Sequence, residues 1–240
     1  MIAPTTRDEP PDEDDLARRL ADVDARIVEA ARTAGRRPEE ITRIVVTKFH
    51  PARLVERLYG LGVRDVGENR QQELSAKHEA VGPLAGLRWH FIGQAQTNKA
   101  RAIRSAAAVV HSVDRPKIAD ALDRAADESE PLLDVFLQVN LTDDPGRGGV
   151  APGELNALAD HTARCDTLRV RGVMAVAPLD EAPAAAFERL ARYAEAVRAV
   201  VPDANWLSAG MTGDFAEAIA IGATHLRIGT AITGPRPERG

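Results

Sequence analysis

Lys48 is the side chain whose type and setting point most directly to chemistry. It follows Ile44–Thr47, a run apolar enough for a strand covered on both faces, and strand alternation puts Val46 and Lys48 on one face. An amine in such a setting loses hydration, which favours the neutral nucleophile that forms a Schiff base. The alternative is a lysine that reaches solvent from the strand end and pairs with Glu68 or Asp65.

Two short loops of small residues near the end of the chain could hold a phosphate. Ser208–Asp214 leads into a helical pattern, with Thr212 as a candidate N-cap and Asp214 in the first turn. Gly229 and Thr230 form a second tight turn. Backbone N–H groups without an intrahelical acceptor suit a phosphate at such turns. Ordinary capping and tight turns are the alternative interpretation.

Arg227 belongs to the last apolar run of the chain. Alternation there places His225, Arg227 and Gly229 on one face. A guanidinium inside a barrel must find acceptors, because an unpaired buried charge is very costly. Asp65 or Glu68 could serve as its partner, and so could the ring nitrogen of a heterocyclic ligand.

The histidine and cysteine pattern predicts no metal site. His90, His111 and His225 are separately spaced and have no matching cysteine, so we expect them to be core or site-lining residues. Cys165 is the only cysteine, which fits a reducing compartment and leaves no disulfide framework.

The elements that must position these residues alternate along the chain. After an amphipathic helix over Leu16–Arg32, eight apolar, β-rich runs alternate with helical patterns, and no long helix follows Ile228. In a chain of 240 residues this alternation predicts a single-domain α/β fold, a (βα)8 TIM-type barrel in which the extra N-terminal helix covers the last side. A doubly wound sheet is the rival. The expected strands are Ile41–Thr47, Val63–Val66, Leu87–Ile92, Val109–Val113, Val135–Val139, Leu168–Val176, Trp206–Ser208 and Thr224–Ile228. The expected helices between them are Pro51–Tyr59, Arg70–Ala80, Asn98–Ala106, Pro116–Ala126, Pro152–Ala163, Ala184–Val201 and Asp214–Ile221.

The polar residues fall where the expected strands end. Lys48 ends the first strand, Asn69 follows the second, and Met174 lies near the end of the sixth. Both small-residue loops follow the seventh and eighth strands. Because the carboxyl ends of barrel strands form one face, which carries the active site, we expect these residues to gather there.

Composition and charge exclude several classes of protein. The formal charge of −5 argues against a nucleic-acid partner. The chain has no signal peptide and no apolar run of about 18 residues, so we expect a cytoplasmic protein without a membrane partner. Residues 1–15 form an acidic tail that we expect to be disordered, and residues 16–240 form the barrel domain. The other lysines lie in helical or loop patterns and are expected to be solvated: Lys77, Lys99 and Lys117.

Seven sequence blocks, in order between about Leu16 and Gly234, resemble the pyridoxal phosphate homeostasis (YggS-like) family. The blocks are Val46–Lys48, Val66–Glu73, Trp89–Lys99, His111–Asp114, Gly172–Met174, Leu207–Thr212 and Arg227–Ile232. The resemblance implies a barrel similar to the N-terminal domain of alanine racemase, which is PLP fold type III without the C-terminal β domain. It also implies that the barrel carries pyridoxal 5′-phosphate (PLP).

The resemblance implies a role for each matching residue. Lys48 would form the Schiff base with PLP, Arg227 would face the pyridine nitrogen, and Asn69 and Met174 would line the ring. The phosphate would be held by Ser208, Thr212, Gly229 and Thr230, with Met211 also among the cofactor-binding residues. The chain departs from the common pattern at Phe49–His50, Ala209, Thr212 and Arg147. Arg147 stands where lysine is usual, which puts in doubt any role for a second lysine near the site.

An arginine opposite the pyridine nitrogen would restrain carbanion chemistry. It only donates hydrogen bonds and so favours an unprotonated nitrogen. The resemblance implies that alanine racemase works with such an arginine but uses a base on each side of the substrate, one from a second domain, for which 240 residues leave no room. We therefore expect a protein that binds, protects and supplies PLP to client enzymes, as a monomer or weak homodimer, with no assured catalytic residue. The alternatives are a PLP-dependent amino-acid racemase of low activity and, ranked last, a Schiff-base aldolase on a similar barrel.

Overall fold

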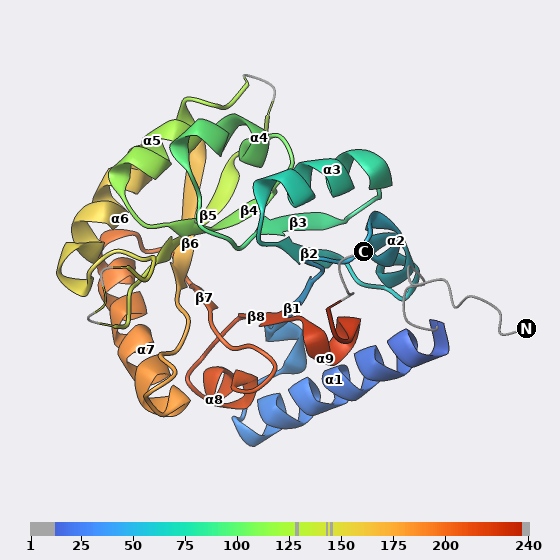
Figure 1. The fold of residues 1–240 in the computed structure, drawn as a ribbon. Helices are drawn as coiled ribbons and strands as arrows, with labels where there is room; N and C mark the ends of the chain where they lie inside the picture. The colour runs from blue at the N-terminus through green and yellow to red at the C-terminus, as the bar shows by residue number, and fades with distance from the viewer. Residues whose placement is uncertain (1–12, 128–129, 143, 145, 237–240) are drawn as a thin grey trace, which may run out of the picture.

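The expected strands close into one parallel barrel, in which consecutive strands pair and β8 pairs with β1. The computed structural model describes residues 13–127, 130–142, 144 and 146–236, and shows the helices arranged around the strands (Figure 1). This closure confirms the predicted barrel and excludes the doubly wound sheet. The strands are β1 (Thr42–Val46), β2 (Asp65–Glu68), β3 (Arg88–Phe91), β4 (Val109–Val113), β5 (Leu133–Gln138), β6 (Leu168–Met174), β7 (Trp206–Ser208) and β8 (His225–Ile228).

The helices occupy the segments that the alternation predicts. The α4 segment is shorter than expected because Thr97–Lys99 forms a 3₁₀ turn before it, and Pro152–Glu154 does the same before α6. Within the described residues, no helix has both the length and the apolar character needed to cross a bilayer. The helices are α1 (Glu13–Thr33), α2 (Ala52–Gly60), α3 (Gln71–Val81), α4 (Ala100–Arg104), α5 (Pro116–Asp123), α6 (Leu155–Ala163), α7 (Pro183–Val200), α8 (Phe215–Ala220) and α9 (Thr230–Thr233).

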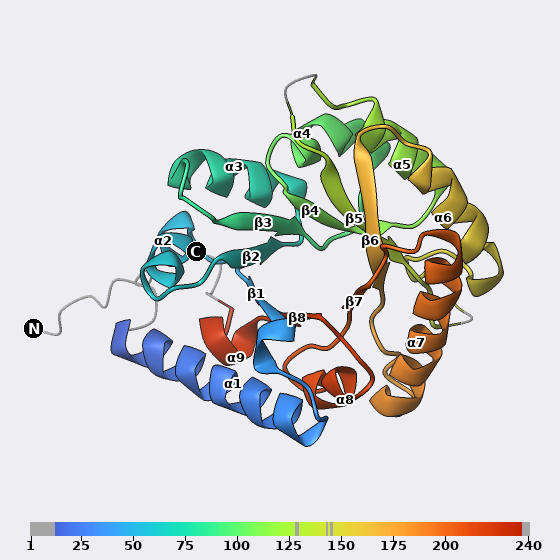
Figure 2. The same cartoon turned by 180° about the vertical axis from the view of Figure 1, so that it is seen from behind.

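Helix α1 takes the place of a long helix after β8, as predicted. Figure 2 shows it lying along α8 and α9 on the outside of the barrel. Arg19 donates to the carbonyl of Ile232 at 2.8 Å, and Arg36 donates to the carbonyls of Ile219 and Ala223 at 3.1 and 2.7 Å. These bonds join α1 and the residues that follow it to backbone carbonyl groups in α8, in the turn after α8 and in α9.

The predicted boundary of the N-terminal tail is three residues too late. Helix α1 begins at Glu13, and the carboxylate of Asp15 pairs with Arg18 and Arg19 within its first turns. The remainder of the predicted tail, residues 1–12, lies outside the described residues.

The two sides of the sheet differ in chemistry. The outer side packs against apolar helix faces, with Leu54, Leu58 and Leu74 fully buried between the layers. The inside of the barrel holds a small apolar cluster of Val109, Phe136 and Met174, together with buried polar and charged side chains. The buried polar group comprises His90, His111, Ser208, His225 and Arg227.

Candidate functional site

The predicted site residues gather at the carboxyl end of the barrel. Lys48 follows β1, Asn69 follows β2, and the segments at Met211–Thr212 and Thr230 follow β7 and β8. Since β1 pairs with β2 on one side and with β8 on the other, the loops that carry Asn69 and Thr230 flank Lys48. The fold therefore brings together residues that are far apart in the sequence.

Lys48 is exposed instead of being enclosed by apolar side chains. Strand β1 ends at Val46 and the chain then turns through Phe49, which has a φ of 71°. The prediction that Lys48 loses hydration in an apolar setting is wrong, because the strand ends at Val46 and the lysine on the following turn is exposed. Among the described residues, the Lys48 amine has no hydrogen bond or ion pair and lies 5.8 Å from the centroid of the Phe49 ring. It remains available as a nucleophile.

Lys77 on α3 is the buried lysine of this region, so the prediction that it is solvated is wrong. Its Nζ donates to Glu68 Oε1 at 2.6 Å and to the carbonyl of Thr47 at 2.8 Å, and the Thr47 hydroxyl donates to the same Glu68 oxygen at 2.5 Å. Burial raises the pKa of Glu68 despite the nearby Lys77 ammonium. The spacing of three residues from Leu74 to Lys77 places the lysine on the buried face of α3 and is the signal that could have revealed it. These bonds fix Thr47, the residue just before Lys48.

The turn after Lys48 is fixed on its other side by Glu73. The backbone N–H of Phe49 donates to Glu73 Oε2 at 2.8 Å. The guanidinium groups of Arg70 and Arg236 lie 5.6 and 3.9 Å from the centroid of the Phe49 ring. Together with Lys48 they make this part of the barrel face positive, which favours an anionic ligand.

Arg227 is buried inside the barrel, as alternation predicts, but its partners are neither Asp65 nor Glu68. Nη1 donates to Ser208 Oγ at 2.6 Å and Nη2 donates to the carbonyl of Ala175 at 2.7 Å. Burial lowers the pKa of Arg227 to about 10, so the guanidinium remains charged at neutral pH.

Ser208, which accepts this hydrogen bond from Arg227, is fully buried. Its hydroxyl also bonds to His111 Nδ1 at 2.9 Å. The hydroxyl of Ser208 is therefore bonded to both Arg227 and His111 in this structure, and the expected phosphate contact of Ser208 stays a prediction. His111 in turn bonds to His90 at 3.0 Å, so these two histidines form a connected pair that their spacing in the sequence does not reveal.

The two small-residue loops offer backbone donors. The N–H of Met211 donates to Asp214 Oδ1 at 2.6 Å, whereas no acceptor for the N–H groups of Thr212 and Gly213 lies among the described residues. Gly229 precedes α9, whose first N–H groups have no intrahelical acceptor. Helix α8 starts after Asp214, so Asp214 and not Thr212 is the N-cap residue. Donors without acceptors on an open loop suit a phosphate.

The two predicted ring-lining residues lie in different environments. Asn69 is exposed at the barrel face, whereas Met174 is only 2% exposed and packs inside the barrel against Phe136. The loop of Asn69 is held by a close backbone approach, because a Cβ on Gly93 would lie 1.9 Å from the carbonyl oxygen of Asn69. This contact requires glycine at position 93.

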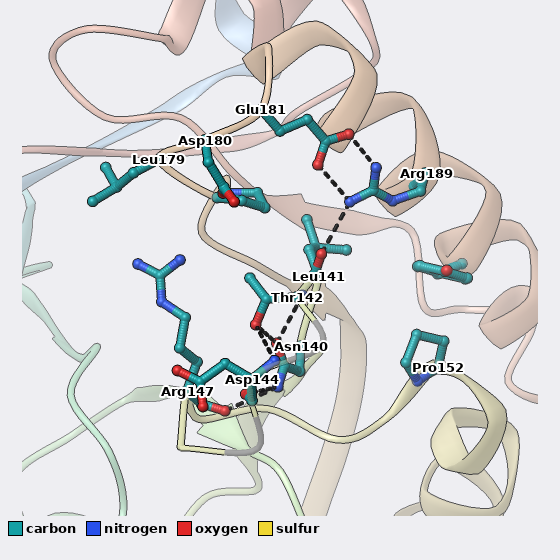
Figure 3. A pocket seen from close by; sticks show the side chains of 12 residues that line it. Asn140, Leu141, Thr142, Asp144, Arg147, Pro152, Leu179, Asp180, Glu181 and Arg189 are labelled. Carbon is teal, nitrogen blue, oxygen red and sulfur yellow. Dashed lines mark hydrogen bonds and ion pairs between the residues drawn. The ribbon is translucent and has the colours of Figure 1, made fainter.

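A cleft of about 860 Å³ opens beside the ends of β5 and β6. Figure 3 shows Arg147 and Asp144 on one side of it and Leu179, Asp180 and Glu181 on the other. Arg189 closes one end through a bidentate ion pair with Glu181 and a bond to the carbonyl of Leu141 at 3.0 Å. Lys48 and the two small-residue loops do not line this cleft.

We predict that Lys77→Met destabilises the fold by about 3 kcal/mol, because it leaves the buried Glu68 carboxyl without its ionic partner. The measurement is the free energy of unfolding by urea. Lys117→Met is the matched control, since Lys117 is exposed on α5, and should change that free energy by no more than about 0.5 kcal/mol. Equal effects of the two substitutions would contradict the role assigned to Lys77.

We also predict that stability decreases below about pH 6.5. Burial lowers the pKa of His90 and His111, and lowers the pKa of His225 to about 3. The unfolded chain therefore takes up protons near pH 6.5 that the folded chain does not. The stabilisation is complete above that pH and is lost below it, by up to about 1.4 kcal/mol per pH unit for each histidine. The raised pKa of Glu68 acts in the opposite sense.

The check is urea unfolding at about pH 7.5 and about pH 5.5 for the wild type and His225→Leu. The variant lacks one of the three groups, so its loss of stability between the two pH values should be smaller. An equal loss in both proteins would show that His225 takes up its proton in the folded state as well.

Comparison with known proteins agrees with this geometry. A family model described as "Alanine racemase, N-terminal domain" matches residues 20–237. The "Pyridoxal phosphate homeostasis protein" of Mycobacterium tuberculosis (strain ATCC 25618 / H37Rv) is 39% identical over 248 residues and covers 96% of each chain. The protein of that name from Pseudomonas aeruginosa is 41% identical over 221 residues, covering 92% of this chain and 96% of its own.

Solved structures give the same result. PipY of Synechococcus elongatus PCC7942, solved with PLP bound, superposes with a TM-score of 0.81 at 33% identity and covers 91% of this chain and all of its own. Alanine racemase from Corynebacterium glutamicum, at 16% identity and a TM-score of 0.67, shares the fold and covers 95% of this chain but 63% of its own. Because the family model and these relatives span nearly the whole chain, it belongs to the pyridoxal phosphate homeostasis protein family, which is built on the alanine racemase N-terminal domain.

Proposed function

We propose that this chain binds PLP at the carboxyl face of its barrel and acts in PLP homeostasis, by holding, protecting and supplying the cofactor. The observation that carries the proposal is the amine of Lys48, which has no hydrogen bond or ion pair within the described part of the chain. It stands on a fixed turn between loops whose backbone donors likewise find no acceptor there. The PLP-bound structure of the relative PipY supports it.

The groups at this face fit PLP one by one. The Lys48 amine matches the aldehyde, and the donors at Thr212, Gly213 and Thr230 match the phosphate. Arg227, buried in the barrel interior, would supply a donor for the ring nitrogen. When bound, PLP supplies an aldehyde that joins a lysine amine through a carbon–nitrogen double bond, and a ring that withdraws electrons from it.

The residues around the site restrain catalysis. A guanidinium offers hydrogens and no lone pair, so Arg227 favours a ring nitrogen without a proton, which withdraws electrons less strongly. The carboxylates beside the Lys48 turn are also committed, Glu68 to Lys77 and Glu73 to the N–H of Phe49. Neither is free to act as a second base opposite Lys48. We therefore propose a carrier without robust catalysis.

The exposed position of Lys48 suits a cofactor that must leave again for client enzymes. Three of the exposed large apolar side chains, Val176, Leu179 and Met211, belong to loops on this face. Elsewhere on the described surface only Leu132 and Val200 are of this kind, too few for an obligate interface. We propose a monomer or weak homodimer in the cytoplasm, where an unpaired cysteine such as Cys165 is stable.

We predict that the protein mixed with PLP shows a near-visible absorbance band that Lys48→Ala abolishes. The reason is that Lys48 provides the amine that joins the aldehyde. Lys117→Ala, at an exposed lysine on α5, is the control and should keep the band. The proposal fails if the wild type never develops the band, or if Lys48→Ala retains it.

The second candidate function is that of a low-activity amino-acid racemase, which the relation of the fold to alanine racemase favours. Long incubation of the PLP-loaded protein with single enantiomers of amino acids separates the two. A carrier leaves the enantiomeric purity unchanged. Racemisation that depends on Lys48 would replace the carrier proposal with the racemase.

A further inference from the structure

A continuous chain of hydrogen bonds crosses the inside of the barrel from Asp65 to Arg227. Arg227 Nη1 donates to Ser208 Oγ at 2.6 Å, and Ser208 Oγ lies 2.9 Å from His111 Nδ1. His111 Nε2 lies 3.0 Å from His90 Nδ1, and His90 Nε2 lies 2.9 Å from Asp65 Oδ1. All members are buried except Asp65, whose side chain is 14% exposed.

Arg227 and Asp65, at the two ends of this series of hydrogen bonds, determine which partner donates in every bond between them. Arg227 only donates, so Ser208 Oγ accepts from it and the single hydroxyl hydrogen is left for His111 Nδ1. His111 then carries its hydrogen on Nε2 and donates to His90 Nδ1. His90 carries its hydrogen on Nε2 and donates to the Asp65 carboxylate. If every bond ran the other way, the hydrogen of a neutral His90 would be on Nδ1. The lone pair on Nε2 would then face the negatively charged oxygen of Asp65, which is repulsive.

The charges along the chain agree with this assignment. Burial lowers the pKa of both His90 and His111, so both rings are neutral at pH 7. Burial acts to raise the pKa of Asp65, but the hydrogen bond from His90 and the neighbouring Arg88 guanidinium outweigh it and lower that pKa. The chain thus joins a cation and an anion through three neutral groups whose dipoles point the same way, and such alignment strengthens each bond.

Arg227 depends on this chain for its orientation. Among the described residues its acceptors are Ser208 Oγ and the carbonyl of Ala175, and neither carries a charge. A serine hydroxyl rotates freely unless its hydrogen has a fixed acceptor, which here is His111. Without His111, one of the two acceptors of Arg227 is no longer held in place.

We propose that Ser208, His111 and His90 are positioning residues for Arg227, which hold its guanidinium so that a donor faces the ring nitrogen of PLP. This proposal rests on the function proposed above for the ligand. The fixed orientation of the Arg227 guanidinium does not depend on PLP, so it can be measured in the cofactor-free protein.

His225 provides a matched control for His111. It is buried in the same interior, 3% exposed, with its ring centroid 6.4 Å from that of His111. Its hydrogen bond goes to the hydroxyl of Thr224, and it bonds to none of the residues that link Asp65 to Arg227. His111→Leu and His225→Leu therefore each remove one buried imidazole, but only the first interrupts the path to Arg227.

The experiment compares three readouts in both variants. In the cofactor-free proteins, NMR of the Arg227 side chain should show slowly rotating Nη hydrogens in the wild type and in His225→Leu, and should lose them in His111→Leu. In the PLP-bound proteins, His111→Leu should weaken PLP binding by about tenfold and shift the near-visible absorbance maximum. His225→Leu should change neither. Imidazole ¹⁵N shifts should place hydrogen on Nε2 of both His90 and His111.

Two further variants keep the test decisive if His111→Leu does not fold. Ser208→Ala removes the side-chain acceptor of Arg227 Nη1 and should reproduce the loss of the slow Nη hydrogens. His111→Gln retains an oxygen that accepts from Ser208 and an amide that donates to His90, and should restore them. Equal effects of the His111 and His225 substitutions, or slow Nη hydrogens in Ser208→Ala, would overturn the proposal. A wild type with slow Nη hydrogens that fails to bind PLP would overturn only the proposed function.

Discussion

The burial of one positive charge inside the ring of strands is the constraint on which the interior depends. Arg227 loses its hydration there, and the cost is offset only by acceptors placed around it. The hydrogen-bond acceptors that contact it are neutral, and the hydrogen bonds that continue from Ser208 through His111 and His90 end at the carboxylate of Asp65. This explains why the middle of the barrel is polar, whereas the apolar residues of the chain are concentrated between the sheet and the helices.

The Lys48 turn shows the complementary arrangement at the barrel face. Its amine is exposed, but the backbone on either side is fixed, by Lys77 at the carbonyl of Thr47 and by Glu73 at the N–H of Phe49. A fixed backbone with an open side chain suits a covalent bond that forms and breaks repeatedly. A site that only catalysed would gain from excluding water, and the exposure of Lys48 does not provide that.

The sequence was sufficient for the barrel and for the face on which the site lies, because alternation and strand ends are local patterns. It failed at the environment of Lys48, because the strand ends at Val46, one residue before the expected end at Thr47, and the lysine is exposed. It failed at Lys77 because an ion pair with Glu68 on another element offsets the cost of burial. The bond between His111 and Ser208 joins residues 97 positions apart and depends on barrel closure, so no local pattern reveals it.

The most direct test of the central claim is to locate the covalent bond to PLP. Borohydride reduces a carbon–nitrogen double bond by hydride transfer and leaves the cofactor permanently attached to the lysine nitrogen. The chain has only the lysines Lys48, Lys77, Lys99 and Lys117, so peptide mass spectrometry of the reduced complex distinguishes all four. We predict that the label lies on Lys48. A label on another lysine, or none on the PLP-saturated protein, would contradict the account.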